Sequence, residues 1–428
     1  MGLPGQKGSD FEQERFPAIA VRKSLWRFII VRLFGARWTG VLTSPFGLVY
    51  STQWARSPLP SKDWVRIRPL LSGICGSDLA VIKGTSSLYL APLISFPFVL
   101  GHEIVGKVTE AGQGATDLLG KRVVVEPALG CFVREQQEPC AACASGFQSL
   151  CEKVTEGIIS PGIQTGYCHD TGGGWSHEFL AHRSQVHIVP DHLADEVVVL
   201  TEPFACALHG AVRLLNEHPQ VKNILVIGCG SMGLLTIAAI RALERQEGRE
   251  PVRIVAVGRY DHQRHWAEKV GADLVVPDGP PVRLYPDLAR ESGASLHRPE
   301  LGLPTVLGGF DAVIDCVGSQ KSLNDSVRWA RSGGSVLLIG MPAEPRVTWT
   351  AVWFKEVTVQ GVYAYGVEEW IGRKIRTFSL ALDLMASGTG DLTGFVSHIF
   401  PLSRWKEAVQ TALRPGRYRS VKVALKPD

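Results

Sequence analysis

The chain has 428 residues, of which 45% are hydrophobic and 20% charged, and its formal net charge is +4. That length is too great for one compact core and predicts two domains. Lys and Arg are dispersed rather than gathered in a tract, which argues against a nucleic-acid-binding protein. No apolar run reaches the roughly 18 residues of a membrane span, because Arg27, Arg32 and Arg37 interrupt the segment from Leu25 to Tyr50.

Residues 1–50 are predicted to form an N-terminal extension with one or two strands, and we assign it no role. Asp10, Glu12 and Glu14 precede every apolar run, which argues against a signal peptide. Nine cysteines without such a signal predict a reducing, cytoplasmic compartment. The basic residues of the extension could form an amphipathic surface, but we prefer a solvated face for them: Arg22, Lys23, Arg27 and Arg32.

Residues 51–200 are predicted to form a β-rich domain. Short β-runs such as Ile104–Thr109 and Arg122–Glu126 are separated by Gly and Pro. This pattern is typical of an irregular sheet with long connections rather than of a helical domain.

The β-rich domain also contains candidate metal ligands. Cys75 offers a thiolate, and the sequence Gly101-His102-Glu103 offers an imidazole and a carboxylate. A catalytic zinc ion takes three protein ligands and keeps one position open for water or substrate. The third ligand could be Glu103 or Glu202. Taken singly, each of these residues is better explained as an ordinary buried thiol, a core histidine or a helix-terminal residue, and the surrounding motifs change that balance.

Residues 201–365 change to alternating apolar strands and amphipathic helices, which predicts an α/β domain with a doubly wound parallel sheet. The first helix should pack through Leu234, Leu235, Ile237, Ala238, Ala242 and Leu243. Four apolar runs read as buried parallel strands: Ile224–Ile227, Ile254–Val257, Ala312–Val317 and Val336–Ile339.

Two further segments complete the predicted organisation. The stretch Pro280–Pro304 is rich in Pro, Gly and charge, which predicts an insertion of low order. Residues 366–428 are predicted to return to the β-rich domain through a helix over Thr377–Ala386 and strands at Ile399 and Val421–Leu425.

The first strand of the α/β domain opens into a glycine-rich turn, Gly228-Cys229-Gly230-Ser231-Met232-Gly233. The first glycine permits a tight turn, the second lets the backbone approach a pyrophosphate, and the third lets the helix pack on the strand. The helix N-terminus then favours the phosphate charge. With its strand and helix context, this turn predicts dinucleotide binding by Gly228, Gly230, Ser231, Met232 and Gly233.

The next strand ends at Gly258, where an NAD site usually has an acidic residue for the adenosine ribose. Arg259 follows, with Arg264 nearby. An arginine fork would hold a 2′-phosphate that a carboxylate would repel. We therefore favour NADP over NAD. In the alternative, Arg259 is solvated and Asp261 binds the ribose.

With these motifs, the chain resembles the zinc-dependent medium-chain dehydrogenase/reductase family over about residues 60 to 428. It is most similar to the sorbitol, threonine and glucose dehydrogenase branches, which carry Glu-Pro where this chain has residues 202–203. The resemblance rests on residues 73–78, 101–106 with Gly112, 172–175, 189–191, 202–203, 228–233, 315–318 and 355–361.

The resemblance implies a GroES-like catalytic domain, a Rossmann domain and a cleft between them. Cys75 and His102 would be zinc ligands, with Glu202 slightly preferred as the third and Glu103 exchanging with it. Ser77 would begin a proton relay. Ala80 departs from the pattern, because a relay histidine often stands there. Val317 and Gly340, which follow two later strands, would join the cofactor-binding residues.

Cys140, Cys143 and Cys151 match the spacing of the family's structural zinc lobe, which holds four thiolates. The remaining ligand normally lies three positions before Cys140, where this chain has Gln137. We expect Cys131 to replace it; Glu135 or Glu138 could otherwise complete the site. The remaining four cysteines are expected to be structural: Cys168, Cys206, Cys229 and Cys316.

The sequence thus predicts an oxidoreductase that transfers hydride between an alcohol or polyol and NADP(H), with catalytic and structural zinc. Family members are usually dimers or tetramers, so the resemblance also implies a homo-oligomer acting on a small molecule. The alternatives are a zinc-free quinone or enoyl reductase, and a non-catalytic NADP-binding sensor. The substrate, the preferred reaction direction and the oligomeric state cannot be read from the sequence.

Overall fold

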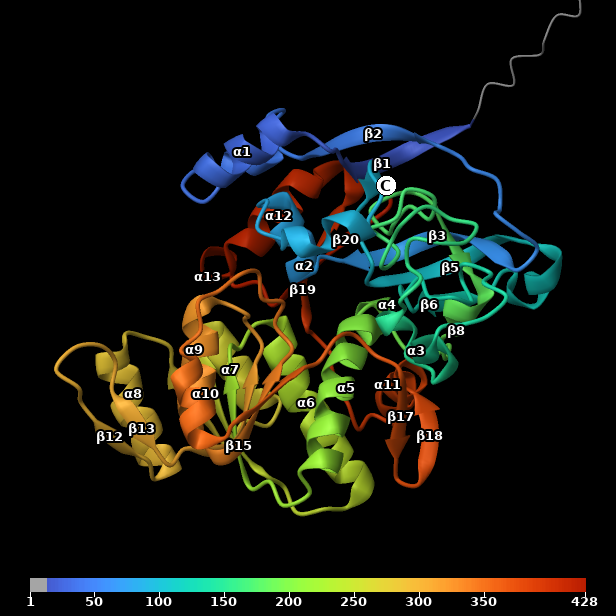
Figure 1. The fold of residues 1–428 in the computed structure, drawn as a ribbon. Coiled ribbons are helices and arrows are strands. Elements are labelled where there is room, and N and C mark those ends of the chain that lie inside the picture. The colour runs from blue at the N-terminus through green and yellow to red at the C-terminus, as the bar shows by residue number, and fades with distance from the viewer. Residues whose placement is uncertain (1–13) are drawn as a thin grey trace, which may run out of the picture.

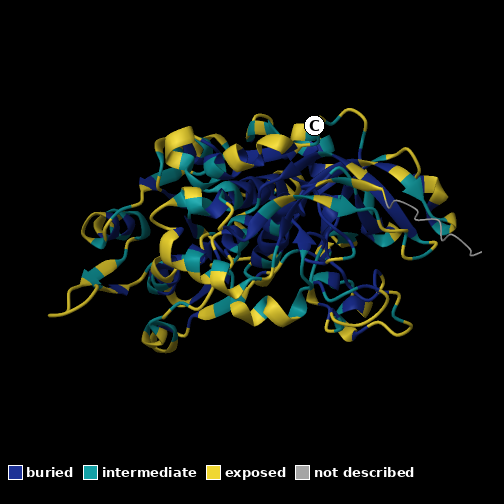
Figure 2. Ribbon diagram, turned by 90° about the horizontal axis from the view of Figure 1, so that it is seen from above, coloured by how far each residue is buried: buried dark blue, intermediate teal, exposed yellow. Residues whose placement is uncertain are grey.

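The computed structural model describes residues 14–428, so Asp10 and Glu12 of the predicted extension lie outside the described residues. A six-stranded sheet with its helices lies below a β-rich region that carries both ends of the described chain (Figure 1). Buried residues follow the sheets through both parts, and exposed residues lie along the outer sides of the helices (Figure 2).

The six-stranded sheet is parallel throughout, with the order β11-β10-β9-β14-β15-β16. It confirms the predicted doubly wound sheet and adds two short edge strands that the apolar pattern did not reveal, β11 and β16. The strands are β9 (Asn223–Ile227), β10 (Arg253–Gly258), β11 (Leu274–Pro277), β14 (Phe310–Asp315), β15 (Ala330–Leu338) and β16 (Thr358–Gly361).

Both faces of this sheet are buried because successive side chains alternate between them. Ile224 and Val226 pack into the cluster formed with α5 and α6, whereas Leu225 and Ile227 pack into the cluster formed with α8 and α9. The predicted packing side of the first helix is confirmed, since all six of its residues are buried. The helices are α5 (Thr201–Glu217), α6 (Ser231–Glu247), α7 (Asp261–Lys269), α9 (Gln320–Trp329), α10 (Trp349–Lys355) and α11 (Thr377–Ala386).

The prediction of low order for Pro280–Pro304 was wrong. This stretch forms helix α8 (Pro281–Ser292) and, with the residues that follow, the hairpin β12 (Ser295–His297) and β13 (Thr305–Leu307). Pro281 occupies the first helical turn, where a missing N–H costs nothing. Leu284, Tyr285 and Leu288 are buried at helical spacing, which the Pro-rich composition concealed.

The β-rich region contains a seven-stranded sheet of order β19-β20-β3-β5-β6-β8, with β7 also paired to β3. The final strand lies antiparallel to β3 and aligns Ala424 with Gly73, so the chain end returns to the segment that carries Cys75. The strands are β3 (Trp64–Gly73), β5 (Ile104–Ala111), β6 (Arg122–Val125), β7 (Phe179–His182), β8 (Val186–Ile188), β19 (Val396–Pro401) and β20 (Lys422–Lys426).

Several short elements connect these sheets. A hairpin precedes α11, and two helices lie between β19 and β20. Their bounds are α2 (Gly76–Ile82), α3 (Ala141–Ala144), α4 (Asp195–Val198), β17 (Val367–Trp370), β18 (Arg373–Arg376), α12 (Trp405–Leu413) and α13 (Pro415–Tyr418).

The described part of the predicted extension packs against the β-rich region. Strand β1 (Arg15–Val21) pairs with β2 (Val49–Ala55) and with β4 (Phe98–Val99). Between β1 and β2 lies a helix that we had not predicted, α1 (Leu25–Phe34), whose exposed side is largely apolar. We expected the basic residues of this segment on a solvated face: Lys23 and Arg32 are exposed and Arg22 and Arg27 are half-buried. Exposed apolar side chains share that surface. Within residues 14–428, the helices are all too short or too polar to cross a membrane.

Candidate active site

Cys75 is the N-cap residue of α2, immediately after β3. Its backbone N–H donates to Asp78 Oδ2 at 2.9 Å, so the residues of the first turn fix the position of the thiol. Gly73 at the end of β3 is constrained by contact, because a Cβ there would lie 1.9 Å from Glu103 Oε2. Only glycine lets the carboxylate of Glu103 approach this backbone.

His102 is buried between the α2 turn and the surrounding charges. Its Nε2 lies 3.2 Å from Ser77 Oγ, and its Nδ1 lies 3.5 Å from Asp78 Oδ1. Burial by itself would lower the pKa of His102, but the charges of Asp78, Cys75 and Glu202 outweigh it and raise the pKa to about 10. The imidazole therefore lies in a pocket of negative charge, and such a pocket favours a positively charged group at this position.

Glu103 is buried and forms an ion pair with Lys422 of β20. Burial would lower the pKa of Lys422, but the Glu103 carboxylate and the nearby Cys75 and Glu202 raise it. The pair uses Oε1 of Glu103, while Oε2 is a buried oxygen without a hydrogen-bond partner. One oxygen of this carboxylate thus remains available to a ligand.

Glu202 lies in the first turn of α5 and is also buried. Burial, assisted by the charge of Glu103, raises the pKa of Glu202 to about 7 despite the opposing effect of His102. Cys206 Sγ, one turn further along α5, donates to Glu202 Oε1 at 3.5 Å. Glu202 therefore faces the same charged pocket as His102 and Glu103.

These donors fit a zinc ion by their chemistry, since thiolate, imidazole and carboxylate are its usual ligands. Their mutual spacing is looser than that of a closed metal site. Within residues 14–428, the four cysteines of the lobe are the one group whose ligand atoms all lie within 4.8 Å of one another. The set Cys75, His102, Glu103 and Glu202 does not meet that spacing.

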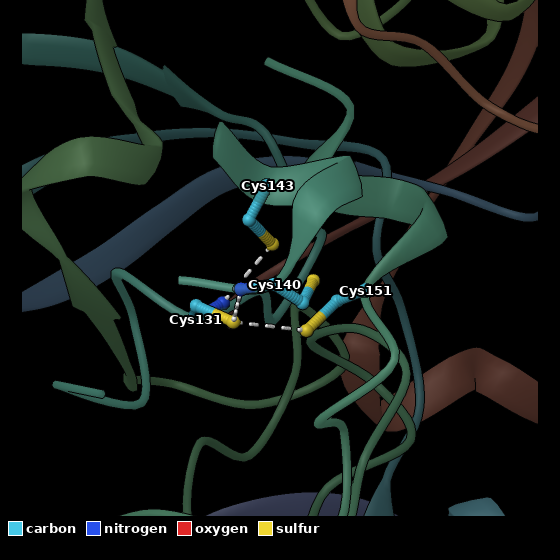
Figure 3. Close-up of side chains that lie close together, drawn as sticks. All are labelled: Cys131, Cys140, Cys143 and Cys151. Carbon is cyan, nitrogen blue, oxygen red and sulfur yellow. Dashed lines mark hydrogen bonds between the residues drawn. The ribbon is translucent and has the colours of Figure 1, made fainter. Parts of the chain in front are cut away.

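The cysteine lobe brings together Cys131, Cys140, Cys143 and Cys151, all buried, with the sulfurs pointing at one another (Figure 3). The sulfurs of Cys131 and Cys151 lie 3.6 Å apart, close to the roughly 3.8 Å that tetrahedral Zn–S bonds of about 2.3 Å require. Backbone N–H groups point at three of these sulfurs: Cys131 N to Cys143 Sγ at 3.4 Å, Cys140 N to Cys131 Sγ at 3.3 Å, and Lys153 N to Cys151 Sγ at 3.3 Å.

Cys131 is the fourth member of this cluster, as expected from the sequence. Gln137 is not part of the group, and neither Glu135 nor Glu138 joins it. All four cysteines are free thiols. The lobe is therefore a four-sulfur cluster able to hold a metal ion.

The glycine turn has the backbone that phosphate binding requires. Gly228 has φ +100°, which favours glycine. A Cβ at Gly233 would lie 1.7 Å from the carbonyl oxygen of Gly228, so the helix can approach the strand only with glycine there. Gly230 is the N-cap of α6, and Ser231 Oγ donates to the carbonyl of Val421 at 2.7 Å. Met232 packs partly against the core.

The end of β10 offers no carboxylate. Gly258 is buried against Arg264, whereas Arg259 is exposed, with its guanidinium 5.5 Å from the Tyr260 ring. Asp261 is exposed and pairs with Arg264. The two arginines expected from the sequence thus lie at the same strand end, but one of them is engaged by an acid.

Val317 and Gly340 meet at the ends of β14 and β15. A Cβ at Gly340 would lie 2.5 Å from the backbone nitrogen of Val317, so glycine permits this approach. Beside Gly340, a groove runs between the two parts of the molecule, with walls from Ser87, Tyr89 and Leu90 on one side and residues 341–344 on the other.

Sequence reasoning gave no role to two residues of the pocket. Asp78 faces His102 from the motif around Cys75, and its position three residues into a helix could have suggested a partner for the imidazole. Lys422 comes from the far end of the chain. A lone lysine in a predicted strand carries no signal of its buried partner Glu103.

Comparison with known proteins assigns the family. Residues 61–191 match the family model of the alcohol dehydrogenase GroES-like domain, and residues 237–386 match that of the zinc-binding dehydrogenase. The chain belongs to the zinc-containing medium-chain alcohol dehydrogenase family. This dehydrogenase is thus an NAD(P)-dependent zinc enzyme acting on CH–OH donors.

Curated relatives span most of this dehydrogenase. L-idonate 5-dehydrogenase of Vitis vinifera is 28% identical over 356 residues, covering 82% of this chain and 85% of the relative. L-threonine 3-dehydrogenase of Saccharopolyspora erythraea is 28% identical over 364 residues, covering 84% and 91%. Sorbitol dehydrogenase of Bacillus subtilis is 25% identical over 367 residues, covering 83% and 89%.

Solved structures share the fold of this dehydrogenase. An alcohol dehydrogenase from Escherichia coli complexed with NADH has a TM-score of 0.69 at 19% identity, covering 96% of this chain and 99% of the other. A zinc-binding dehydrogenase from Sinorhizobium meliloti bound to NADP has a TM-score of 0.66 at 24% identity, covering 97% and 100%. At these identities the likeness concerns the fold alone, and the two cofactors do not decide between NAD and NADP.

Proposed function

We propose that this enzyme oxidises a small polyol, sugar acid, amino alcohol or secondary alcohol, with Cys75, His102 and Glu202 as the ligands of a catalytic zinc ion. The observation that carries the proposal is the pocket of buried acidic groups around His102, in which Asp78 Oδ1 lies 3.5 Å from Nδ1 and both Glu103 and Glu202 are buried. Such a pocket favours a cation. The substrate classes are those in the names of the curated relatives, namely an idonate, a threonine and a sorbitol dehydrogenase.

When bound, zinc would supply Lewis acidity to the substrate oxygen, and the nicotinamide would supply the hydride acceptor. Glu202 is the preferred third ligand because Glu103 is already paired with Lys422. Asp78 faces His102 Nδ1 and would hold the ring so that Nε2 points into the site. Ser77 Oγ, 3.2 Å from that Nε2, is positioned to begin a proton relay: it would accept the substrate's hydroxyl proton while passing its own proton on to a ribose hydroxyl of the bound nicotinamide nucleotide.

We assign the second zinc ion to the cysteine lobe. Its four buried sulfurs leave no open coordination position, so the ion would stabilise the fold and take no part in the reaction. All nine cysteines are free, which supports a reducing, cytoplasmic compartment.

We further propose that NADP is preferred over NAD, because Gly258 leaves no carboxylate at the end of β10 and Arg259 is exposed there. The variant Arg259→Ala should lose a charge-assisted contact and raise KM for NADP about 10-fold or more, while KM for NAD changes little. Asp261→Ala is the matched control and should leave the NADP value within a few-fold. Equal effects of Arg259→Ala on both cofactors would refute the phosphate role.

A homo-oligomer is also proposed. Strand β16 is an edge of the six-stranded sheet, and α10, which precedes it in the chain, exposes Trp349, Trp353 and Phe354. An uncovered strand edge with apolar neighbours is a common surface for subunit contact. Light scattering of the full chain and of Trp353→Gln tests this, since the variant should shift toward the monomer.

The function itself is tested by zinc analysis together with nicotinamide absorbance over a panel of idonate, sorbitol, threonine and secondary alcohols. We expect turnover of at least one alcohol, with loss of turnover after zinc is chelated. Turnover of quinones or enones that survives chelation would favour a zinc-free reductase. Tight dinucleotide binding without turnover of any alcohol or ketone would favour a sensor.

A further inference from the structure

The segment between β1 and β2 carries an exposed apolar surface. It contains α1 and the short 3-10 helix η1 (Thr39–Thr43). Leu25 is 76% exposed and Leu33 is 68% exposed, values that are high for leucine. We name the full set the α1 face: Leu25, Trp26, Ile29, Leu33, Phe34, Trp38 and Phe46.

The helical members of the α1 face lie on one side of α1. At about 100° per residue, Leu25, Ile29, Leu33, Trp26 and Phe34 share one half of the helix circumference. The opposite side carries the contacts to the protein body, where Val31 is buried and Phe28 packs against the same core. The apolar half thus points away from the molecule.

The segment is fixed to the rest of the fold, so its exposure is a property of the folded chain. Leu42 is fully buried. Thr39 and Gln410 of α12 exchange two hydrogen bonds of 2.8 and 2.9 Å. Arg32 Nη1 donates to the carbonyl of Gly84 at 3.2 Å, which ties α1 to the loop after α2.

The charged residues of α1 and of its flanking turns are all basic. Between Glu14 and Asp63 the sequence has no acidic residue. By helix geometry, Arg27 and Arg32 border the apolar half of α1 on its two sides. The basic residues on and beside α1 are Arg22, Lys23, Arg27, Arg32 and Arg37.

Aromatic side chains extend the surface beyond the helix. The rings of Phe34 and Trp38 stack with centroids 5.7 Å apart, and the guanidinium of Arg27 lies 4.2 Å from the Trp26 ring. Tryptophan and arginine side by side on an apolar face are typical of helices that lie in a lipid headgroup region.

We propose that the α1 face docks this enzyme on the surface of an anionic lipid bilayer, with α1 parallel to the membrane plane. The apolar half would enter the headgroup boundary, and the surrounding arginines and Lys23 would meet lipid phosphates. A second copy of the chain is a poorer occupant, because a symmetric pairing would bring two basic segments together. The docking does not depend on the proposed substrate.

The helix that carries the docking surface is attached to a helix of the candidate active site. Cys75 is the N-cap of α2, and the carbonyl of Gly84, just beyond the end of α2, accepts the hydrogen bond from Arg32 of α1. Helix α1 is therefore attached to the end of the helix whose N-cap is the candidate zinc ligand Cys75.

Flotation of the full-length enzyme with vesicles tests the proposal. Vesicles of phosphatidylcholine mixed with phosphatidylglycerol should carry the protein upward, and vesicles of phosphatidylcholine alone should carry much less. The triple variant Leu25→Gln, Ile29→Gln, Leu33→Gln should bind anionic vesicles at least about 10-fold more weakly. The matched control replaces three exposed aliphatic residues elsewhere, Leu119→Gln, Val282→Gln and Leu301→Gln, and should bind like the wild type.

A second variant, Lys23→Gln with Arg37→Gln, tests the electrostatic part and should lose roughly 5-fold in binding per charge removed, with less dependence on salt. The activity of each variant on alcohols in solution shows whether it is folded. If the triple variant is inactive, the vesicle binding of the charge variant tests the proposal in its place. The proposal is overturned if the wild type does not bind anionic vesicles, or if both α1 variants bind them as strongly as the wild type. It is also overturned if light scattering shows that the triple variant only dissociates an oligomer.

Discussion

The cysteine lobe and the pocket around Cys75 both offer metal ligands, but they are built in different ways. The lobe takes its four sulfurs from residues 131–151, and local backbone N–H groups orient them. The pocket takes its donors from the α2 turn, from the start of β5 and from α5, with Lys422 added from the last strand. This contrast agrees with the proposed roles, in which the four-sulfur lobe is a closed stabilising site and the pocket keeps one position open to substrate.

Removal of the thiolate at Cys75 should give the largest effect. Cys75→Ser should cut turnover at least about 1000-fold by loss of the metal that stabilises developing charge. Zinc content should fall by one ion per chain, and dinucleotide binding should be retained. Cys206→Ser, which changes a neighbouring thiol that is not an expected ligand, is the control. Unchanged turnover in Cys75→Ser would end the assignment of the catalytic zinc.

Loss of one lobe sulfur should act on stability. Cys143→Ser should lower the melting temperature and the free energy of unfolding by an amount on the order of several kcal/mol, because metal binding there contributes to folding. Calorimetry and zinc analysis measure the two effects. Cys168→Ser, a buried thiol outside the cluster, should keep full zinc content. If Cys143→Ser also retained it, the lobe would not be a zinc site.

A smaller effect is expected from the residue that orients His102. Asp78→Asn keeps the shape but removes the charge facing Nδ1, which should weaken zinc binding at the catalytic site by about 10–100-fold. Competition with a chelator measures this affinity, and lobe zinc should be unaffected. Asp117→Asn on the surface serves as the control. An unaltered affinity would mean that packing alone orients His102.

The sequence predicted the parts of the fold that depend on local patterns. The buried strands, the glycine turn and the bounds of the helix over Thr377–Ala386 follow from apolar periodicity and glycine geometry. The Pro-rich composition misled us at α8, where Pro281 begins a helix and Leu284, Tyr285 and Leu288 pack inward. In α1, apolar residues on every side hid the helical period, so neither the helix nor its exposed face was expected.

The candidate site was only partly predictable, because some of its contacts join residues that are distant in the sequence. Motifs pointed to Cys75, His102, Glu103 and Glu202, because their residue types and neighbours carry the chemistry. The ion pair of Glu103 with Lys422 joins residues 319 positions apart in the chain. No local pattern encodes such a contact, since it arises when β20 aligns beside β3.

The chain segment at Val421 and Lys422 links the two functional centres over a single peptide unit. The carbonyl of Val421 accepts a hydrogen bond from Ser231 in the glycine turn, and the side chain of the next residue holds Glu103. The glycine turn and the acidic side of the pocket are therefore anchored on adjacent residues at the start of β20.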